Sequence, residues 1–308
     1  MFQIVSPDVN FDFVRFRKIA FAFSAVLIVA GLVSLGARGG PNYGIDFSGG
    51  MMLHIGVDEN VPIGDVRDAV EGFEFGEIAV QEFGSQPGEY LLRVPVGDEQ
   101  VGDGRAATIK DALRAAFGDR GFEEKRTEIV GPRVGEDLRR RGILSVLFAT
   151  AMMASYIAIR FQLRFGAGAA IALLHDVLIT IGVLSIANTE ITLSVVAAIL
   201  TVVGYSVNDT VVVSDRIREN MGRFRKDELG PLINRSINET LSRTVLTTGT
   251  SLMVLMALFY FGGGVIHGFA FTLIIGLTAG TYSSIFIASP IVEMWGERDD
   301  TFGEKAKA

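Results

Sequence analysis

Val203-Gly-Tyr-Ser-Val-Asn-Asp-Thr-Val-Val-Val213 ends an apolar run that begins at Leu193. As a helix, this run is long enough to cross the ~30 Å hydrocarbon core of a bilayer. It nevertheless contains an amide and a carboxylate, Asn208 and Asp209. A charge at membrane depth is costly, so it usually faces a protein interior or a water path. We therefore interpret Asp209 as a proton or ion site in a membrane protein.

The composition of the whole chain is that of a membrane protein. Of 308 residues, 49% are hydrophobic, and the mean hydropathy is +0.39, which is high for a soluble enzyme. The absence of cysteine excludes disulfides, thiol nucleophiles and cysteine-based metal sites. Six apolar runs are predicted to span the membrane: 19–37, 142–159, 167–186, 193–213, 245–261 and 269–292.

The first run follows Arg15, Arg17 and Lys18, an arrangement with which a signal peptide also begins. The run is longer than a typical signal-peptide core, and the residues after Leu35 form a poor cleavage site. We therefore predict an uncleaved anchor that follows a cytoplasmic N-terminus, residues 1–18.

Charge is unevenly distributed along the chain. Residues 38–141 carry 13 basic and 20 acidic residues, which accounts for the whole net charge of −7. An acidic domain argues against nucleic acid as a partner, because binding phosphates requires basic side chains. The predicted loop 214–244 leans basic and, with Arg160 and Arg164, it indicates that both termini are cytoplasmic, including the tail 293–308. This topology places Arg139, Arg140 and Arg141 outside, against the tendency of basic residues to lie on the cytoplasmic side. Long translocated domains tolerate such charges.

Residues 38–141 are predicted to form a periplasmic α+β domain. Its strands are expected at 51–57, 77–83, 89–96 and 122–130, its helices at 63–73 and 103–117, and a hairpin turn at 84–88. The order β-α-β-β-α-β is the ferredoxin-like plan. The predicted fold is thus a multi-pass α-helical membrane protein with six transmembrane helices (1+5) and one ferredoxin-like domain between the first two. The domain shows no metal-ligand spacing and no catalytic or phosphate-binding motif, so we expect no enzyme, no metal and no cofactor.

Three short polar residues, Ser206, Asn208 and Thr210, surround Asp209 and are candidates for holding a water chain. Asp209 lies roughly 24 Å along its helix, toward the cytoplasmic end. The alternative is a residue near a helix end that simply reaches water. Arg243 enters the fifth span from the same side, so the two residues could pair, and changing a carboxylate's surroundings is one way to load and release a proton. An ordinary membrane-interface arginine is the alternative for Arg243.

His175 and Asp176 in the third span form a second candidate, a polar relay or a set of helix contacts. Asp176 lies roughly 14 Å into its helix. Adjacent helical residues point about 100° apart, so we expect the two not to pair by themselves. Structural hydrogen bonding between helices is the alternative role. Elsewhere, Gly276 and Gly280 favour a close helix contact. The amphipathic stretch 230–242 is expected either at the membrane surface or as a plain connecting helix.

Four motifs, in order, resemble those of one family. They are Gly44-Ile-Asp-Phe-Ser-Gly-Gly50, Leu173-Leu-His-Asp-Val-Leu-Ile-Thr180, the run 203–213 followed by Asp215-Arg-Ile-Arg-Glu-Asn220, and Asn234-Arg-Ser-Ile-Asn-Glu-Thr-Leu-Ser-Arg-Thr244. The chain resembles the SecD/SecF family of bacterial protein-export membrane proteins, within the resistance-nodulation-division superfamily. Ser214 departs from the pattern, where an aromatic residue is expected.

The resemblance implies a function and partners. It implies a subunit in the cytoplasmic (inner) membrane that, with SecD, uses the proton-motive force in late steps of polypeptide export. The implied partners are SecD, the SecYEG channel, less tightly YajC, a functional link to the ATPase SecA, the translocating polypeptide and lipid. The energy source is the proton gradient, with no cofactor. Asp209 and Arg243 carry over as coupling residues, and the signature residues are Gly44, Asp46, Phe47, Gly49 and Gly50.

Two other function classes are compatible with the sequence. One is a proton-driven exporter of small molecules or lipids, which would need a larger periplasmic domain than about a hundred residues provide. The other is a passive assembly subunit whose charges only hold helices together. Exchanging Asp209 with Arg243 would distinguish a passive assembly subunit from a proton-coupled one, because a static ion pair survives the exchange better than a proton relay does.

Overall fold

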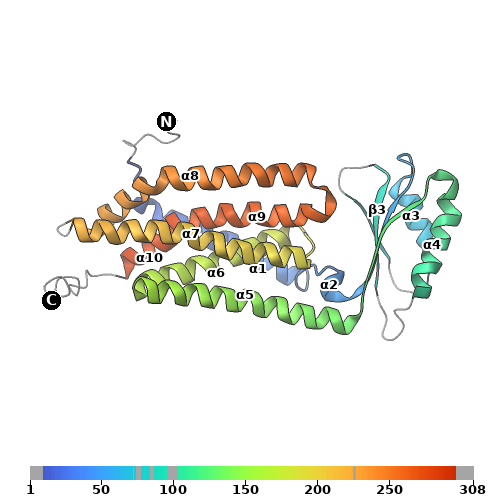
Figure 1. The fold of residues 1–308 in the computed structure, drawn as a ribbon, viewed down its shortest axis with the longest axis horizontal. Coiled ribbons are helices and arrows are strands. Elements are labelled where there is room, and N and C mark those ends of the chain that lie inside the picture. The colour runs from blue at the N-terminus through green and yellow to red at the C-terminus, as the bar shows by residue number, and fades with distance from the viewer. Residues whose placement is uncertain are drawn as a thin grey trace.

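The protein consists of a helical bundle and a small sheet domain placed end to end (Figure 1). The computed structural model describes residues 10–71, 73, 78–83, 87–95, 103–224 and 227–295. Within these residues, six helices are long and apolar enough to cross a membrane. One precedes the sheet domain and five follow it, which confirms the predicted 1+5 arrangement.

Three helices form the centre of the bundle and three lie outside. The apolar stretches of α6, α7 and α9–α10 are 61%, 50% and 61% buried, against 17%, 11% and 17% for α1, α5 and α8. The bounds are η1 (Val14–Phe16), α1 (Arg17–Ala37), α5 (Pro132–Arg160), α6 (Leu163–Ile186), α7 (Leu193–Arg223), α8 (Leu229–Phe261), α9 (Gly263–Ser283), the π-helical turn η3 (Ser284–Ala288) and α10 (Ser289–Met294).

Several helices extend beyond their predicted apolar spans. Helix α5 begins at Pro132 rather than near residue 142, and most of the predicted loop 214–244 belongs to α7 and α8. The extensions are held by one apolar cluster, in which buried residues of α7 and α8 pack with Phe165 (Val213, Ile217, Leu232, Ile233, Ile237). The apolar face of residues 230–242 therefore packs against protein, which agrees with the alternative of a connecting helix and not with a helix that rests on the membrane surface.

The sheet domain has the ferredoxin-like topology. Its elements are β1 (Gly50–Gly56), α3 (Ile63–Val70), β2 (Ala79–Glu82), β3 (Glu89–Val94), α4 (Asp103–Phe117), η2 (Gly118–Arg120) and β4 (Glu123–Val130). The four strands are antiparallel in the order β2-β3-β1-β4, as the β-α-β-β-α-β order predicts. The predicted turn at 84–88 and the ends of two predicted strands, residues 77 and 96, fall partly or wholly outside the described residues.

The helices α3 and α4 cover the face of the sheet that points away from the bundle (Figure 1). The domain core lies between them and the sheet, and its members include the fully buried Leu53, Ile55, Leu92, Ile109 and Leu113. The alternation along β1 and β3 supplies one apolar face, and Ile109, Leu113 and Phe117 supply the matching face of α4.

Candidate functional site

Asp209 is buried in α7, with 2% of its surface exposed. The hydroxyls of Thr248 in α8 and Thr281 in α9 lie beside its carboxylate, and these two hydroxyl oxygens are 2.9 Å apart. The carboxylate oxygen Oδ2 is buried without a hydrogen-bond partner among the described residues. An unsatisfied buried oxygen is rare in folded proteins, so this carboxylate stands out from the other buried polar groups of the bundle.

Arg243 lies near enough to Asp209 for its charge to attract the carboxylate. Its own side chain is exposed on the outside of α8, and Asp209 Oδ2 receives no hydrogen bond from it. The structure therefore places the two predicted coupling residues in the same region, with a long-range attraction in place of a closed pair.

The polar residues around Asp209 point in different directions. Ser206 donates to Asp176 of α6 at 2.5 Å, and Thr210 is 3.0 Å from the hydroxyl of Ser284 in η3. Asn208 is exposed. These residues do not form one cluster around Asp209, because successive residues of a helix turn by about 100°.

His175 and Asp176 contact each other directly. The His175 Nδ1 atom is 2.9 Å from Asp176 Oδ1, so the expectation that adjacent residues would not pair was wrong. Both side chains are buried, with 6% and 1% exposed, and a buried imidazole needs a polar partner, which the neighbouring carboxylate provides. The other carboxylate oxygen, Oδ2, accepts hydrogen bonds from Ser206 at 2.5 Å and Ser283 at 2.8 Å.

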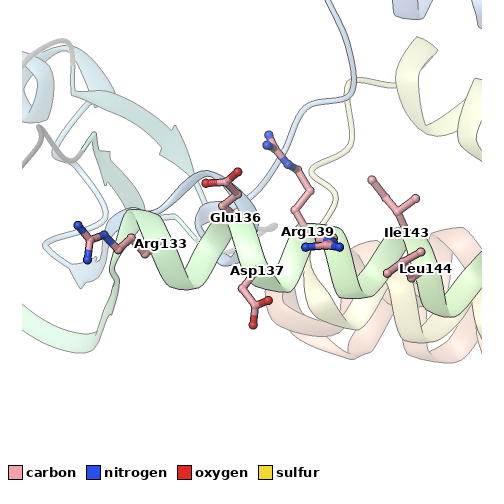
Figure 2. Close-up of a pocket in the computed structure, with 7 residues that line it drawn as sticks. Arg133, Glu136, Asp137, Arg139, Ile143 and Leu144 are labelled. Carbon is pink, nitrogen blue, oxygen red and sulfur yellow. The ribbon is translucent and has the colours of Figure 1, made fainter.

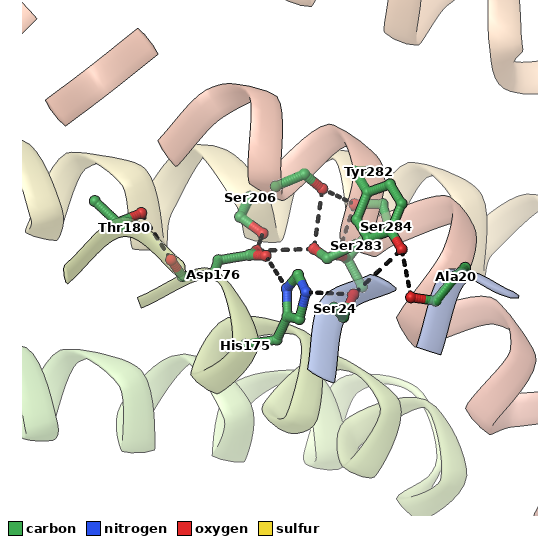
Figure 3. Close-up of polar contacts among 11 residues, drawn as sticks. Ala20, Ser24, His175, Asp176, Thr180, Ser206, Tyr282, Ser283 and Ser284 are labelled. Carbon is green, nitrogen blue, oxygen red and sulfur yellow. Dashed lines mark hydrogen bonds and ion pairs between the residues drawn. The ribbon is translucent and has the colours of Figure 1, made fainter. Parts of the chain in front are cut away.

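The contacts extend from this pair to α1 and α9 (Figure 3). His175 Nε2 is 3.0 Å from the hydroxyl of Ser24, which is 3.2 Å from the hydroxyl of Tyr282. Tyr282 in turn donates to the carbonyl of Ala20 at 2.8 Å and stacks on the imidazole. One buried network thus joins α1, α6, α7 and α9.

Close backbone contact brings α9 onto α7 at this depth. A side chain at Gly276 would collide with Val202, and a Cβ at Gly280 would lie 2.9 Å from that of Ser206. The small residues singled out in the sequence therefore form the predicted close helix contact, and they bring Ser283 within reach of Asp176.

The first signature motif forms the joint between the sheet domain and the bundle, through helix α2 (Ile45–Ser48). Asp46 accepts a hydrogen bond from the backbone N–H of Leu193 at 2.8 Å, at the start of α7. Gly44 donates to the carbonyl of Ile191 at 2.9 Å, and Phe47 is buried in the apolar cluster of the bundle. Two glycines with positive φ, Gly49 (72°) and Gly50 (134°), then turn the chain into β1.

Two further contacts join the domain to the loops of the bundle. Arg93 at the end of β3 forms an ion pair with Glu190 in the loop between α6 and α7. The ring of Phe83 lies against Gly264, at the start of α9. The domain is thus in contact with the same end of several helices.

The first turns of α5 carry the charges that conflicted with the predicted topology. Figure 2 shows them around a shallow surface pocket lined by Arg133, Glu136, Asp137, Arg139, Arg140, Ile143 and Leu144. Arg139 lies over the ring of Tyr43 at 5.7 Å, and Arg141 pairs with Asp137 at 2.7 Å. This segment adjoins the sheet domain, so its arginines lie at the same end of the bundle as that domain. The lining comes from one helix, which gives no enclosed binding site.

Several site residues escaped the sequence analysis. Ser24, Thr248, Thr281, Tyr282 and Ser283 contact the two buried carboxylates or the histidine. The available signal was their position as hydroxyl residues inside apolar helices, where a polar group needs a partner. Among the described residues, no group of three or more His, Asp or Glu side chains could hold a metal ion.

The sequence is similar to known proteins over most of its length. Residues 108–298 match the family described as protein export membrane protein SecD/SecF, C-terminal. The protein translocase subunit SecF of Desulfurispirillum indicum is 45% identical over 296 residues, which cover 93% of this chain and 92% of that protein. The protein translocase subunit SecF of Vibrio alginolyticus is 43% identical over 291 residues, covering 94% and 91%.

A solved structure shares the fold. The crystal structure of SecDF, a translocon-associated membrane protein from Thermus thermophilus, superposes with a TM-score of 0.85 at 35% identity. The match covers 96% of this chain and 40% of the SecDF chain. A second SecDF structure, described as the super-membrane-facing form, gives a TM-score of 0.69 and covers 41% of that chain.

Proposed function

The chain belongs to the SecD/SecF family of protein-export membrane proteins, and on that premise we propose that it couples proton movement to late steps of polypeptide export. It acts with SecD, at the SecYEG channel, in steps that follow the action of SecA; YajC is a further, weaker partner. The membrane is the bacterial cytoplasmic membrane. The basic residues at the end of the bundle opposite the sheet domain support cytoplasmic termini.

The observation that carries this proposal is the incomplete environment of Asp209. Its Oδ2 atom is buried and unpartnered among the described residues, while Arg243 attracts it from the exposed side of α8. A carboxylate in this position changes its charge when a proton enters. Proton binding removes the attraction to Arg243, and proton release restores it, so the contact between α7 and α8 responds to protonation.

A neighbouring subunit is needed to complete the site. The exposed residues of α7 include the polar or small Thr201, Gly204 and Asn208, and α8 exposes Arg243 and Thr250 beside apolar side chains such as Leu246 and Met253. Thr201, Gly204 and Asn208 share one helix face by their spacing. Polar side chains and glycines in apolar helices favour helix–helix contact over lipid contact. We assign this face to SecD, whose side chains would surround Arg243.

The route from the membrane site to the sheet domain runs through the start of α7. Asp46 holds the backbone of Leu193, and Arg93 holds Glu190 two residues before Thr192 caps the helix. A shift of α7 along its axis therefore displaces the domain. One elementary charge that crosses 100 mV supplies about 2.3 kcal/mol, which is enough to bias a movement between two arrangements.

The test is export of a secreted precursor in membranes that lack the native protein and receive this chain with SecD. Asp209→Asn is compared with wild type, with and without a proton gradient, after equal insertion and SecD association are verified. Asp215→Asn is the matched control, because Asp215 is an exposed carboxylate of the same helix. We expect Asp209→Asn to lose the gradient-dependent part of export and Asp215→Asn to keep it. A full response of Asp209→Asn to the gradient would exclude this residue from the proton path.

A further inference from the structure

The network around His175 contains more hydrogen-bond contacts than a neutral histidine beside a carboxylate can satisfy. Tyr282 directs its one hydroxyl proton to the carbonyl of Ala20, so its oxygen can only accept from Ser24. Ser24 also has one hydroxyl proton. When that proton is donated to Tyr282, the oxygen of Ser24 must accept from His175, and Nε2 must carry a hydrogen.

The second ring nitrogen faces the carboxylate. His175 Nδ1 and Asp176 Oδ1 are 2.9 Å apart, so one proton lies between them. It belongs either to the nitrogen, giving an imidazolium beside a carboxylate, or to the oxygen, giving a neutral imidazole beside a carboxylic acid. In both forms the pair holds two protons and has no net charge.

Removing one proton leaves the pair with a net charge of −1 and breaks one contact. The remaining ring proton stays on Nδ1, toward the carboxylate, and Nε2 becomes an acceptor. Ser24 must then turn its proton from Tyr282 to His175. The hydrogen bond from Ser24 of α1 to Tyr282 of α9 therefore forms only when the pair carries the additional proton, whereas the bond from Tyr282 to the carbonyl of Ala20 is present in both states.

We propose that His175 and Asp176 form a proton-binding site separate from Asp209, whose occupancy sets the hydrogen bond between Ser24 of α1 and Tyr282 of α9. Helix α1 leads directly into the joint with the sheet domain. At the α9 end of the network, the π-helical turn η3 begins one residue after Ser283, and such turns are frequent at functional positions. Proton uptake at this site thus adds a second hydrogen bond between α1 and Tyr282.

The surroundings of the pair contain few other titratable groups within the described residues. Tyr282 of α9 stacks on the imidazole, with ring centroids 5.9 Å apart. Asp209 of α7 lies one turn beyond Ser206, the residue that donates to Asp176. The charged residues of α1, Arg17 and Lys18, are about two turns before Ser24, and Arg164 of α6 is about three turns before His175.

Histidine labelling gives a direct test. The chain has three histidines, so ¹⁵N-histidine in the full-length protein in nanodiscs gives few ring signals, and His175→Gln identifies those of His175. We expect the ring signals to show Nε2 of His175 in both protonation states when the pH is varied over the range in which the protein stays folded. A ring that keeps one protonation state throughout this range would overturn the proposal.

Matched serines separate proton binding from helix packing. Ser24 and Ser34 both link α1 to α6, but the hydroxyl of Ser34 pairs with the hydroxyl of Ser185, at 2.9 Å, and not with the histidine. We expect Ser24→Ala to weaken proton binding at His175 about tenfold, because Nε2–H loses its acceptor. Tyr282→Phe, which removes a single oxygen, should have a smaller effect in the same direction, and Ser34→Ala should have none. Equal effects of Ser24→Ala and Ser34→Ala would overturn the proposal.

The same spectra distinguish this site from the proposed coupling residue. In Asp209→Asn, His175 should still titrate, whatever the effect of that variant on export. Loss of the His175 titration in Asp209→Asn would show one shared site and would contradict the separation proposed here.

Discussion

The two buried carboxylates of the bundle, Asp176 and Asp209, have almost equal exposure, 1% and 2%, and opposite surroundings. Both oxygens of Asp176 have hydrogen-bond partners, the imidazole at Oδ1 and two serines that donate to Oδ2. Asp209 has an oxygen without a hydrogen-bond partner among the described residues and an arginine at a distance. Burial alone therefore does not define the role of an intramembrane carboxylate, since one of these is completed by its own chain and the other is not.

The difference follows from how the helices approach α7. Gly276 and Gly280 let the backbone of α9 lie closely against Val202 and Ser206 of α7, and this contact brings Ser283 to Asp176. On the other side, α8 contributes short threonines near Asp209, and the outer surface of α7 and α8 is left exposed. The closed side holds helices together, while the open side is where a second subunit can act.

The largest expected difference is in stability. Asp176→Ala leaves His175, Ser206 and Ser283 buried without their acceptor, and breaking a buried polar network in this way costs about 3–5 kcal/mol. Asp209→Ala removes a carboxylate that already has an unpaired oxygen, so we expect a change of less than about 1 kcal/mol. Reversible unfolding in mixed micelles, followed by circular dichroism, measures both. Equal losses would contradict the contrast between the two carboxylates.

A smaller effect on stability is expected from replacing glycines of two kinds, Gly276 at the contact between α7 and α9 and Gly204 on the exposed face of α7. The Cβ of Gly276→Ala would overlap the side chain of Val202, and overpacking of this kind costs about 1–3 kcal/mol. Gly204 has no atom near its would-be Cβ. Gly204→Ala should therefore leave the stability of the isolated chain unchanged within about 0.5 kcal/mol, yet it places a methyl group on the face assigned to SecD. Co-purification with SecD checks that second consequence.

Apolar run length and strand alternation were sufficient to predict the six spans and the ferredoxin-like domain. Each element is defined locally, by about twenty apolar residues or by a period of two. The ends of the helices were not predictable in the same way. Helices α7 and α8 extend beyond their predicted spans because Ile217, Ile233 and Phe165, distant in sequence, share one apolar cluster.

The candidate site was predictable only in part, for the same reason. Asp209, Arg243, His175 and Asp176 stand out as charged or polar residues in apolar helices. Their partners Ser24, Tyr282 and Thr281 are ordinary hydroxyl residues, whose role depends on which helices adjoin. The contact between His175 and Asp176 was mispredicted because helical spacing describes the direction of Cβ and not the reach of a turned imidazole.

A third carboxylate, Glu89 in β3, extends the comparison to the sheet domain. It is 9% exposed, forms an ion pair with Lys125, and lies 2.8 Å from His54 Nε2. Burial by itself would raise the pKa of Glu89, but the hydrogen bonds and charges of Lys125 and His54 outweigh it and lower the pKa. Unlike Asp209, this carboxylate is paired with a cation within its own domain.

The sign of the pH dependence follows from that lowered pKa. The folded domain binds the Glu89 proton less readily than the unfolded chain, so Glu89 stabilises the domain above the usual glutamate pKa, and this contribution is lost as pH falls through the folded value. Glu89→Gln should therefore weaken the domain at neutral pH, with a deficit that shrinks in acid. Hydrogen exchange of β1 and β3 in the full-length protein, corrected for intrinsic rates, measures this. Glu123→Gln, at an exposed carboxylate of β4, is the control, and a deficit for Glu89→Gln that stays constant with pH would show that Glu89 acts by shape and not by charge.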